Sequence, residues 1–298
     1  MQNNHKKIFQ ATLFVATSGI LYGFLGFLGT GILRENIPIS TMLFWRFIIA
    51  GSWIFLFVIR KYLIKRAFCP IDTRTLFFTF LLGAVGYAGS SGFYFIASQY
   101  TGTGLAMVIF FSFPIIVALA SWMKNRENIN AVTIFTLISM ITGLFLLRDS
   151  PTHQFNTIGI FFGIVAAICY AFYVMGSKRI SSTTVDSNLL TTIVCLGCAF
   201  IFLMLSISSH TYVFPHSIKS WLYLLALGIF ATALPIQLML EGLRYISSMR
   251  ASIISVLEPL VTVFVGVLLL DESISHLQIF GISIILVSTV LVQFQRKL

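Results

Sequence analysis

Runs of apolar residues long enough to cross a lipid bilayer follow one another along almost the whole chain. Hydrophobic residues make up 58% of its 298 residues and charged residues only 9%, whereas a soluble domain has roughly 25% charged residues. A helix needs about 20 apolar residues to span the hydrocarbon core. Ten such segments are predicted, at residues 8–31, 38–59, 75–98, 103–123, 129–147, 157–177, 187–208, 220–243, 250–270 and 275–294. The predicted fold class is an all-α membrane protein with ten transmembrane helices.

One segment of the chain recurs 145 positions later without a gap. Residues 100–135 and 245–280 share eight identities in 36 positions, where so apolar a composition gives roughly three by chance. The identical pairs are Tyr100 with Tyr245, Ala106 with Ala251, Ile109 with Ile254, Pro114 with Pro259, Glu127 with Glu272, Ile129 with Ile274, Ile134 with Ile279 and Phe135 with Phe280. Five predicted helices separate equivalent points, and because five is odd the copies cross the membrane in opposite directions. The chain is therefore predicted to form two inverted five-helix repeats, residues 1–150 and 151–298, which is an architecture of secondary transporters.

Glycines indicate close helix packing. Gly83, Gly86, Gly89 and Gly92 recur every third residue in the third predicted helix. Small residues let helix backbones approach one another in lipid. A three-residue spacing drifts around a helix of 3.6 residues per turn, so we expect this helix to touch neighbours on several sides.

Lysine and arginine are concentrated on one side of the predicted bundle. Fifteen of the 19 lie in segments on the side of the two termini, Arg34, Arg148 and Lys219 lie on the opposite side, and Arg46 lies within a helix. Cytoplasmic loops carry an excess of these residues. We therefore expect both termini in the cytoplasm. The absence of an organelle-type presequence favours the inner membrane of a bacterium.

Composition and motifs argue against several other functions. The net charge of +10 comes from short clusters between apolar runs, and no basic face with interleaved aromatic residues offers a site for nucleic acid. The sequence holds no HExxH motif, nucleophile elbow or phosphate-binding loop, and no second ligand pair beside Cys195 and Cys198. No enzyme activity, metal site or cofactor is therefore predicted. The expected partners are the lipid bilayer and a small-molecule substrate, with protons as a further option. No large loop suggests an obligate protein partner, although a non-transporting scaffold or receptor stays open as an alternative from another class.

Two charged residues lie well away from the ends of predicted helices, and a charge at the centre of a membrane helix costs about 2.5–3.5 kcal/mol on insertion scales. Glu258 lies near the middle of the ninth helix, and Pro259 after it lacks an N–H group and can kink the helix. In the functional interpretation Glu258 binds a cationic group of a substrate or takes up a proton, whereas in the structural one it joins two helices by hydrogen bonds. Arg46 either attracts an anionic substrate, pairs with an acidic group, or extends to the membrane boundary.

The repeated segments carry a pattern that resembles a known family. Each leads from a tyrosine at the end of one helix, through a proline in the next helix, to a glutamate at that helix's end; the residues are Tyr100, Pro114 and Glu127, and Tyr245, Pro259 and Glu272. With Arg46 in the second helix, the chain is similar over essentially its whole length to the drug/metabolite transporter superfamily, of the ten-helix EamA-like type. Two positions depart from the pattern. Phe113 stands where the ninth helix has Glu258, and Tyr22-Gly23 stands where the family commonly has Trp-Gly.

The resemblance implies a central cavity walled by helices 1, 3, 4, 6, 8 and 9. The residues that it makes available for substrate binding are Glu258, Tyr22, Tyr94, Ser112, Tyr170, Tyr173, Gln237 and Ser255, with Ser90, Ser91 and Ser252 beside them. Those expected to kink helices or gate the cavity are Pro114, Pro259, Glu127, Glu272 and Arg46.

Such a cavity suits an amphipathic metabolite such as an amino acid better than a sugar phosphate, which calls for several buried basic residues. We expect a secondary transporter that exports an amino acid or related compound by alternating access, coupled to a proton at Glu258. The alternatives are a facilitative exchanger without a coupled ion and an importer of a larger nucleoside-like metabolite.

Overall fold

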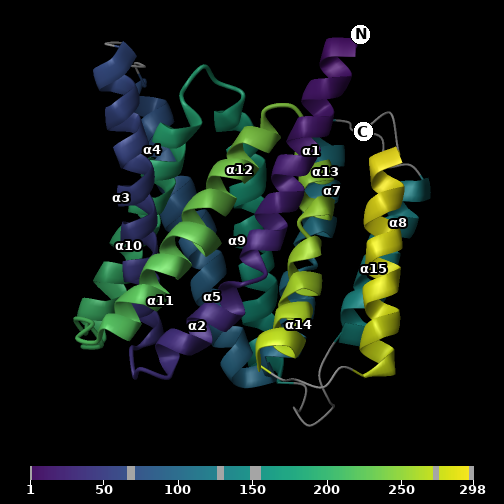
Figure 1. Ribbon diagram of the computed structural model, residues 1–298. Coiled ribbons are helices and arrows are strands. Elements are labelled where there is room, and N and C mark those ends of the chain that lie inside the picture. Colours follow the sequence, from purple (N-terminus) through teal and green to yellow (C-terminus); the bar gives the residue numbers. More distant parts are fainter. Residues whose placement is uncertain (1, 66–70, 126–130, 148–155, 271–274, 295–298) are drawn as a thin grey trace.

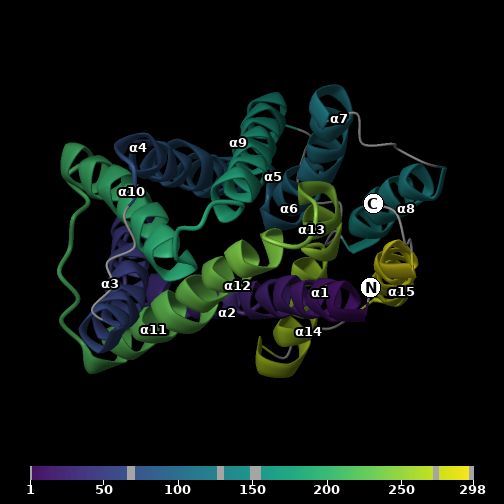
Figure 2. The same ribbon diagram turned by 90° about the horizontal axis from the view of Figure 1, so that it is seen from above.

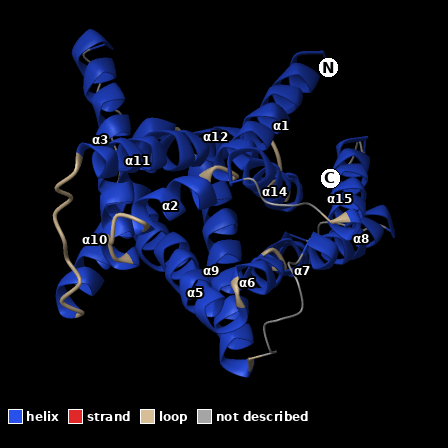
Figure 3. Ribbon diagram, turned by 60° about the horizontal axis from the view of Figure 1, so that its bottom comes forward, coloured by secondary structure: helices blue, strands red, loops and turns tan. Residues whose placement is uncertain are grey.

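The computed structural model describes the whole chain except residues 1, 66–70, 126–130, 148–155, 271–274 and 295–298. The described residues are mostly helical, and no strand occurs among them (Figure 3). The helices are α1 (Gln2–Tyr22), α2 (Leu25–Leu33), α3 (Ile39–Lys65), α4 (Thr73–Leu81), η1 (Leu82–Tyr87), α5 (Ala88–Thr101), α6 (Thr103–Phe110), α7 (Phe113–Asn125), α8 (Ala131–Leu147), α9 (Thr157–Ser181), α10 (Ser187–Ser208), α11 (Ile218–Gly228), η2 (Ile229–Ala233), α12 (Leu234–Leu243), α13 (Ser248–Ile254), α14 (Leu257–Leu270) and α15 (His276–Phe294).

All ten expected spans are found as helices. Five spans consist of two or three helical segments: span 1 of α1 and α2, span 3 of α4, η1 and α5, span 4 of α6 and α7, span 8 of α11, η2 and α12, and span 9 of α13 and α14. Spans 2, 5, 6, 7 and 10 are the single helices α3, α8, α9, α10 and α15. Within the described residues, eight spans are long and apolar enough to cross a membrane, and the other two contain the shorter apolar helices Ala131–Leu146 and His276–Ser288. The predicted all-α membrane fold is confirmed.

Polar residues between the apolar runs determine where several helices begin. The side chains of Asp72, Asn156, Asp186, Ser217 and Ser247 each accept a hydrogen bond from a backbone N–H two or three residues further along. Such a cap satisfies one of the N–H groups that the first helical turn leaves unpaired. The starts of spans 3, 6, 7, 8 and 9 are thereby fixed.

The packing of the helices follows the inverted repeat. α3 packs along α10, α8 along α15, α5 along α9, and α1 along α12 (Figures 1 and 2). In span numbers these pairs are 2 with 7, 5 with 10, 3 with 6, and 1 with 8. Exchanging each span for the one five places away leaves this set of pairs unchanged, as a two-fold relation between the repeats requires.

The start of α1 and the end of α15 lie at the same end of the bundle (Figure 1). We call this end the terminal face and the other end the distal face. The loops between α9 and α10 and between α12 and α13 lie at the terminal face, and those between α2 and α3 and between α10 and α11 lie at the distal face (Figure 1).

Spans 4 and 9 are interrupted at equivalent places. Span 4 breaks between α6 and α7, after Phe110, and span 9 breaks between α13 and α14, after Ile254. Adding 145 to 110 gives 255, so the two breaks agree within one residue. Each break lies shortly before a proline, Pro114 or Pro259, whose ring and missing N–H disfavour a continuous helix through the preceding turn.

Spans 3 and 8 also share an irregularity. Each contains a π-helical segment, η1 at Leu82–Tyr87 and η2 at Ile229–Ala233. Moved by 145 positions, η1 covers residues 227–232 and overlaps η2 over four of its five residues. π-helical turns are rare and occur often at functional sites. Span 1 breaks as well, at Gly23 and Phe24, but α9 in span 6 has no such break.

Candidate functional site

A cavity of about 740 Å³ lies between the distal halves of the spans. Its lining runs from buried side chains in the middle of the bundle, such as Tyr22, Arg46 and Tyr87, to exposed residues at the distal face, such as Leu33 and Thr103. The walls come from α2, α5, α6 and α14, with further residues from α1, α3, η1, α8, α9 and α15. The cavity therefore extends from the middle of the protein to the face away from the termini.

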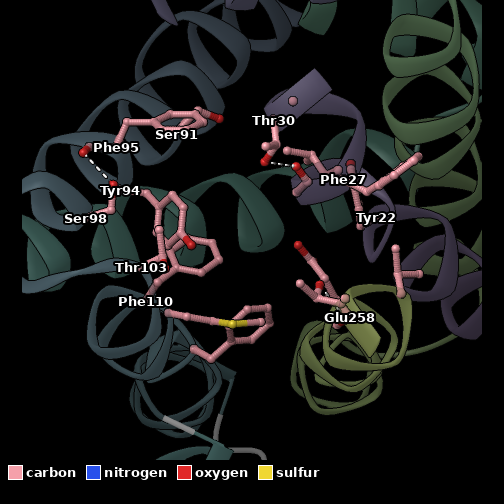
Figure 4. Close-up of a pocket in the computed structure, with 18 of the residues that line it drawn as sticks. Tyr22, Phe27, Thr30, Ser91, Tyr94, Phe95, Ser98, Thr103, Phe110 and Glu258 are labelled. Atoms are coloured by element: carbon pink, nitrogen blue, oxygen red, sulfur yellow. Dashed lines mark hydrogen bonds between the residues drawn. The ribbon is translucent and has the colours of Figure 1, made fainter. Parts of the chain in front are cut away.

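Glu258 faces this cavity from the first turn of α14 (Figure 4). The break in span 9 places it there, because the helix restarts at Leu257 and the backbone N–H of Glu258 donates to the Ser255 carbonyl oxygen over 3.0 Å. A carboxylate is favoured at this position by the partial positive charge of a helix N-terminus. In the described part of the chain, its carboxylate has neither a hydrogen-bond donor nor an ion-pair partner within 4.0 Å. Glu258 is thus available to a ligand.

Arg46 reaches the same cavity from α3 and is only 2% exposed. Its Nε donates to Thr232 Oγ1 over 2.7 Å and its Nη2 donates to the Tyr87 hydroxyl over 3.3 Å. The guanidinium carbon lies 4.9 Å from the ring centroid of Phe47. Tyr87 ends η1 and Thr232 belongs to η2, and 87 plus 145 equals 232, so one side chain bonds equivalent positions of the two repeats. Arg46 is thus enclosed by side chains of both repeats.

Aromatic rings close the cavity toward the terminal face. The ring centroids of Phe113 and Tyr170 lie 4.6 Å apart, those of Tyr87 and Tyr173 lie 4.8 Å apart, and both pairs meet edge to face. Tyr170 and Tyr173 link the two pairs with centroids 5.7 Å apart. All four residues are buried. Edge-to-face pairs stabilise beyond their buried area. Tyr87 and Tyr170 line the cavity, and Phe113 and Tyr173 pack behind them, so that the four rings together form an aromatic floor.

The structure brings some of the expected binding residues together and leaves others outside. The expected residues that line the cavity are Glu258, Arg46, Tyr22, Tyr94, Tyr170, Ser90 and Ser91. On the opposite side of the pocket from Tyr22 and Glu258 lie Tyr94 and Phe110 (Figure 4).

Five expected residues have other surroundings. Ser112, Ser252 and Ser255 donate to backbone carbonyl oxygens three or four residues before them, those of Ile109, Met249 and Ala251. Gln237 accepts a hydrogen bond from Thr191 over 2.6 Å, and Tyr173 belongs to the aromatic floor.

The sequence prediction also missed several polar residues of the cavity. These are Thr30, Tyr87, Ser98, Thr103, Thr262 and Gln278. Pro114 and Pro259 lie next to the helix breaks, and both are buried. Glu127 and Glu272 lie outside the described residues.

No group of three or more His, Cys, Asp or Glu residues suited to a metal ion occurs within the described ranges. Cys195 and Cys198 are buried, and the Cys198 thiol donates to the Gly83 carbonyl oxygen with a separation of 3.2 Å.

Polar contacts tie the helices at both faces. At the distal face Lys219 pairs with Glu35 over 2.9 Å, and Ser217 donates to Glu35 over 3.1 Å. The Lys219 ammonium beside it lowers the pKa of Glu35 below its ordinary value of 4.5. At the terminal face Lys178 donates to the Leu243 carbonyl oxygen over 2.7 Å, which joins α9 to α12.

Comparison with known proteins settles the family. The sequence model of the EamA-like transporter family matches residues 10–148 and 157–294, which is most of the chain. The chain belongs to the EamA-like transporter family. It is accordingly an integral membrane protein and a membrane transporter.

Individual relatives agree with this assignment. The chain is 29% identical over 196 residues to an uncharacterized transporter of Archaeoglobus fulgidus, covering 65% of this chain and 68% of that one. It is 24% identical over 194 residues to the uncharacterized transporter YcbK of Bacillus subtilis, covering 63% and 62%. It is 25% identical over 217 residues to the uncharacterized inner membrane transporter YicL of Salmonella typhimurium, covering 68% of each. The chain thus spans about two thirds of the length of these curated relatives, and slightly less of YcbK. These proteins are named as transporters and not as enzymes.

A solved crystal structure has the same fold. It superposes with a TM-score of 0.81, covering 95% of this chain and 98% of that chain, at 18% sequence identity.

Proposed function

We propose that the protein is a secondary transporter that moves a small polar or amphipathic metabolite, an amino acid or a related compound, by alternating access of the cavity between its two repeats. The observation that carries this proposal is the Glu258 carboxylate, which faces a cavity of about 740 Å³ without a partner among the described residues. Cavities of about 300–1,000 Å³ are typical of small-molecule sites. An unpaired intramembrane carboxylate marks a substrate or ion site.

Arg46 adds the opposite charge to the same cavity. A guanidinium carries five N–H donors, and the described partners Thr232 and Tyr87 take two of them. Arg46 and Glu258 form no ion pair within 4.0 Å. A ligand with a cationic and an anionic group can therefore pair with both residues, and the aromatic rings around them accommodate its apolar part. These features favour a zwitterionic amino acid over a sugar phosphate.

The distribution of charge supports an orientation with cytoplasmic termini. The described basic residues in or near the terminal face are Lys6, Lys7, Arg60, Lys61, Arg74, Lys178, Arg179, Arg244 and Arg250, whereas Arg34 and Lys219 lie at the distal face. With positive residues inside, the cavity opens to the exterior. The proposed location is the inner membrane of a bacterium, in line with the name of the relative YicL. Export is the proposed direction of net transport.

The experiment is transport into proteoliposomes that contain the purified protein, with a panel of labelled amino acids and of analogues that lack either the ammonium or the carboxylate. Glu258→Gln is expected to lower the affinity for the zwitterions about 10- to 100-fold, since a hydrogen bond to a charged group contributes about 1.5–3 kcal/mol. Asp72→Asn is the control, because Asp72 is an exposed carboxylate outside the cavity lining and asparagine can still cap α4. Unchanged kinetics in Glu258→Gln at equal protein abundance refute the assigned site.

Proton coupling is tested in the same vesicles. An imposed pH gradient is expected to drive accumulation in the wild-type protein and not in Glu258→Gln. Transport that is independent of the gradient identifies a facilitative exchanger, the main alternative. Transport of nucleosides but of no amino acid identifies the larger-substrate alternative.

A further inference from the structure

The cavity has a repeat-related counterpart in the half of the bundle toward the terminal face. Spans 3 and 4 match spans 8 and 9 with an offset of 145, as the coincident helix breaks and π-helical segments indicate. Spans 1 and 6 match with an offset of 148, which aligns residues 8–33 with 156–181 and makes five pairs identical. The pairs are Phe14 with Phe162, Ile20 with Ile168, Tyr22 with Tyr170, Phe24 with Phe172 and Ile32 with Ile180. Because the repeats are inverted, residues that line the distal cavity have counterparts near the terminal face.

These counterparts are closed off in this conformation. Six residues of the cavity lining show this. Leu25, Gly29 and Leu33 correspond to Tyr173, Ser177 and Ser181, and Tyr94, Ser98 and Met107 correspond to Met239, Leu243 and Ser252. The lining residues except Gly29 are half-buried or exposed. All six counterparts are at most 2% exposed. One half of a symmetric path is therefore open and the other half is packed shut, as alternating access requires.

Three hydroxyl groups on α9 give an independent sign that this buried half opens. Tyr173, Ser177 and Ser181 are spaced four residues apart and so lie on one face of the helix. Their hydroxyl groups are fully buried and make no hydrogen bond of good geometry in the described part of the chain, although the Tyr173 hydroxyl lies near that of Ser177. Most buried side-chain hydroxyls have a partner, and an exception requires an explanation. A conformation that exposes this face to water or substrate supplies the partners.

Polar contacts hold the buried half closed at its end. Lys178 donates to the Leu243 carbonyl oxygen over 2.7 Å, and Arg244 donates to the Val185 carbonyl oxygen over 2.6 Å. The first bond joins α9 to α12, and the second joins the residue after α12 to the loop between α9 and α10. They lie at the terminal face, on the far side of the aromatic floor from the cavity.

We infer that Tyr173, Ser177, Ser181, Met239, Leu243 and Ser252 line the second half of the substrate path, which opens to the terminal face when the distal cavity closes. The α9 hydroxyl groups then donate hydrogen bonds to the polar part of the substrate. The two halves differ in chemistry, because α2 contributes Leu25, Gly29 and Leu33 to the distal half where α9 contributes hydroxyl groups. This inference rests on the proposed alternating access.

The test is thiol labelling from each side of the membrane. The four native cysteines are replaced by alanine, and single cysteines are introduced as Ser177→Cys and Ser252→Cys in the buried half. Ser91→Cys, in the lining of the cavity, is the positive control from the distal side. Thr79→Cys is the matched negative control, because Thr79 is equally buried, lies in α4 toward the terminal face, and bonds only the carbonyl oxygen of its own helix. A membrane-impermeant methanethiosulfonate reagent is applied to intact cells and to inverted vesicles.

Ser177→Cys and Ser252→Cys are expected to react from the terminal side at about 0.1–10% of the rate of an exposed thiol, the fraction of time that a minor conformation is populated. Thr79→Cys is expected to remain unlabelled under the same conditions. The inference is overturned if Ser177→Cys and Thr79→Cys react at the same rate from the terminal side, whether both stay unlabelled or both are labelled.

Counterflow of labelled amino acids in the same preparation separates this result from the proposed function. A protein that exchanges amino acids while Ser177→Cys stays protected refutes the path alone. A protein that shows neither exchange nor labelling refutes both.

Discussion

Substitution of one glycine tests whether spans 3 and 7 are packed as closely as the structure shows. A Cβ atom added at Gly83 would lie 2.9 Å from both the carbonyl carbon and the Cα of Val194 in α10, and closer still to the Val194 oxygen. Contacts under 3.0 Å essentially never occur for a real Cβ. Because the obstacle is backbone, one helix must move away from the other. Gly83→Ala is therefore expected to lower the free energy of unfolding by about 3 kcal/mol, the upper end of the usual cost of overpacking.

The matched control is Gly92→Ala in the same span. The nearest atom to its added Cβ is Phe202 Cε1, at 3.8 Å, which is an ordinary van der Waals distance. Replacing a helical glycine without a clash stabilises by about 0.5–1 kcal/mol. Thermal unfolding in detergent, followed by tryptophan fluorescence at one scan rate, ranks the variants against the wild type. Equal midpoints for Gly83→Ala and Gly92→Ala would show that the two helices are not in backbone contact.

Two further predictions concern charged side chains. Arg46→Lys keeps the charge, but a lysine cannot donate in a fixed fork to both Tyr87 and Thr232. We therefore expect the free energy of unfolding to fall by about 1.5–3 kcal/mol. An unchanged melting midpoint contradicts this reasoning. The pKa of Glu35 is lowered by Lys219, so its stabilising contribution is present above pH 4.5 and is lost as the pH falls through the lowered value. The difference in melting midpoint between wild type and Glu35→Gln should therefore vanish on acidification, and a difference that does not change with pH argues against the ion pair.

The spans were predictable because each apolar run has the length that a bilayer requires. The direction of the repeat followed from an odd count of these runs, and a proline in each copy indicated where spans 4 and 9 are irregular. The row of glycines in span 3 also has a structural counterpart. An added Cβ would meet α10 at Gly83 and Gly92, and α9 at Gly86 and Gly89.

The face that each helix turns to the cavity could not be read from the sequence. In a soluble protein the polar residues of a helix mark its solvent side, but in lipid a serine is satisfied by its own backbone and faces any direction. Ser112 and Ser255 do this, whereas Thr262 donates to its own backbone as well and still lines the cavity. Polarity alone therefore does not separate the two cases.

The π-helical segments were also beyond sequence reasoning. Thr232 in η2 donates to the Leu227 carbonyl oxygen of its own span and accepts from Arg46 of span 2, and the second contact depends on how the spans pack. The position of Tyr87 at the cavity follows from η1, so this residue escaped prediction with it. The division into residues 1–150 and 151–298 and the roles of Glu127 and Glu272 remain predictions.

The bonds of Arg46 have a consequence for how the halves move. The guanidinium is planar and rigid, and it holds Tyr87 of the first repeat and Thr232 of the second repeat at once. Sliding of span 3 past span 8 by more than about 1 Å stretches at least one of these bonds beyond hydrogen-bonding range. Neither five-helix unit can shift alone at this level of the membrane without breaking a bond. In the proposed alternating access, the exchange of one conformation for the other therefore requires Arg46 to release Tyr87 or Thr232.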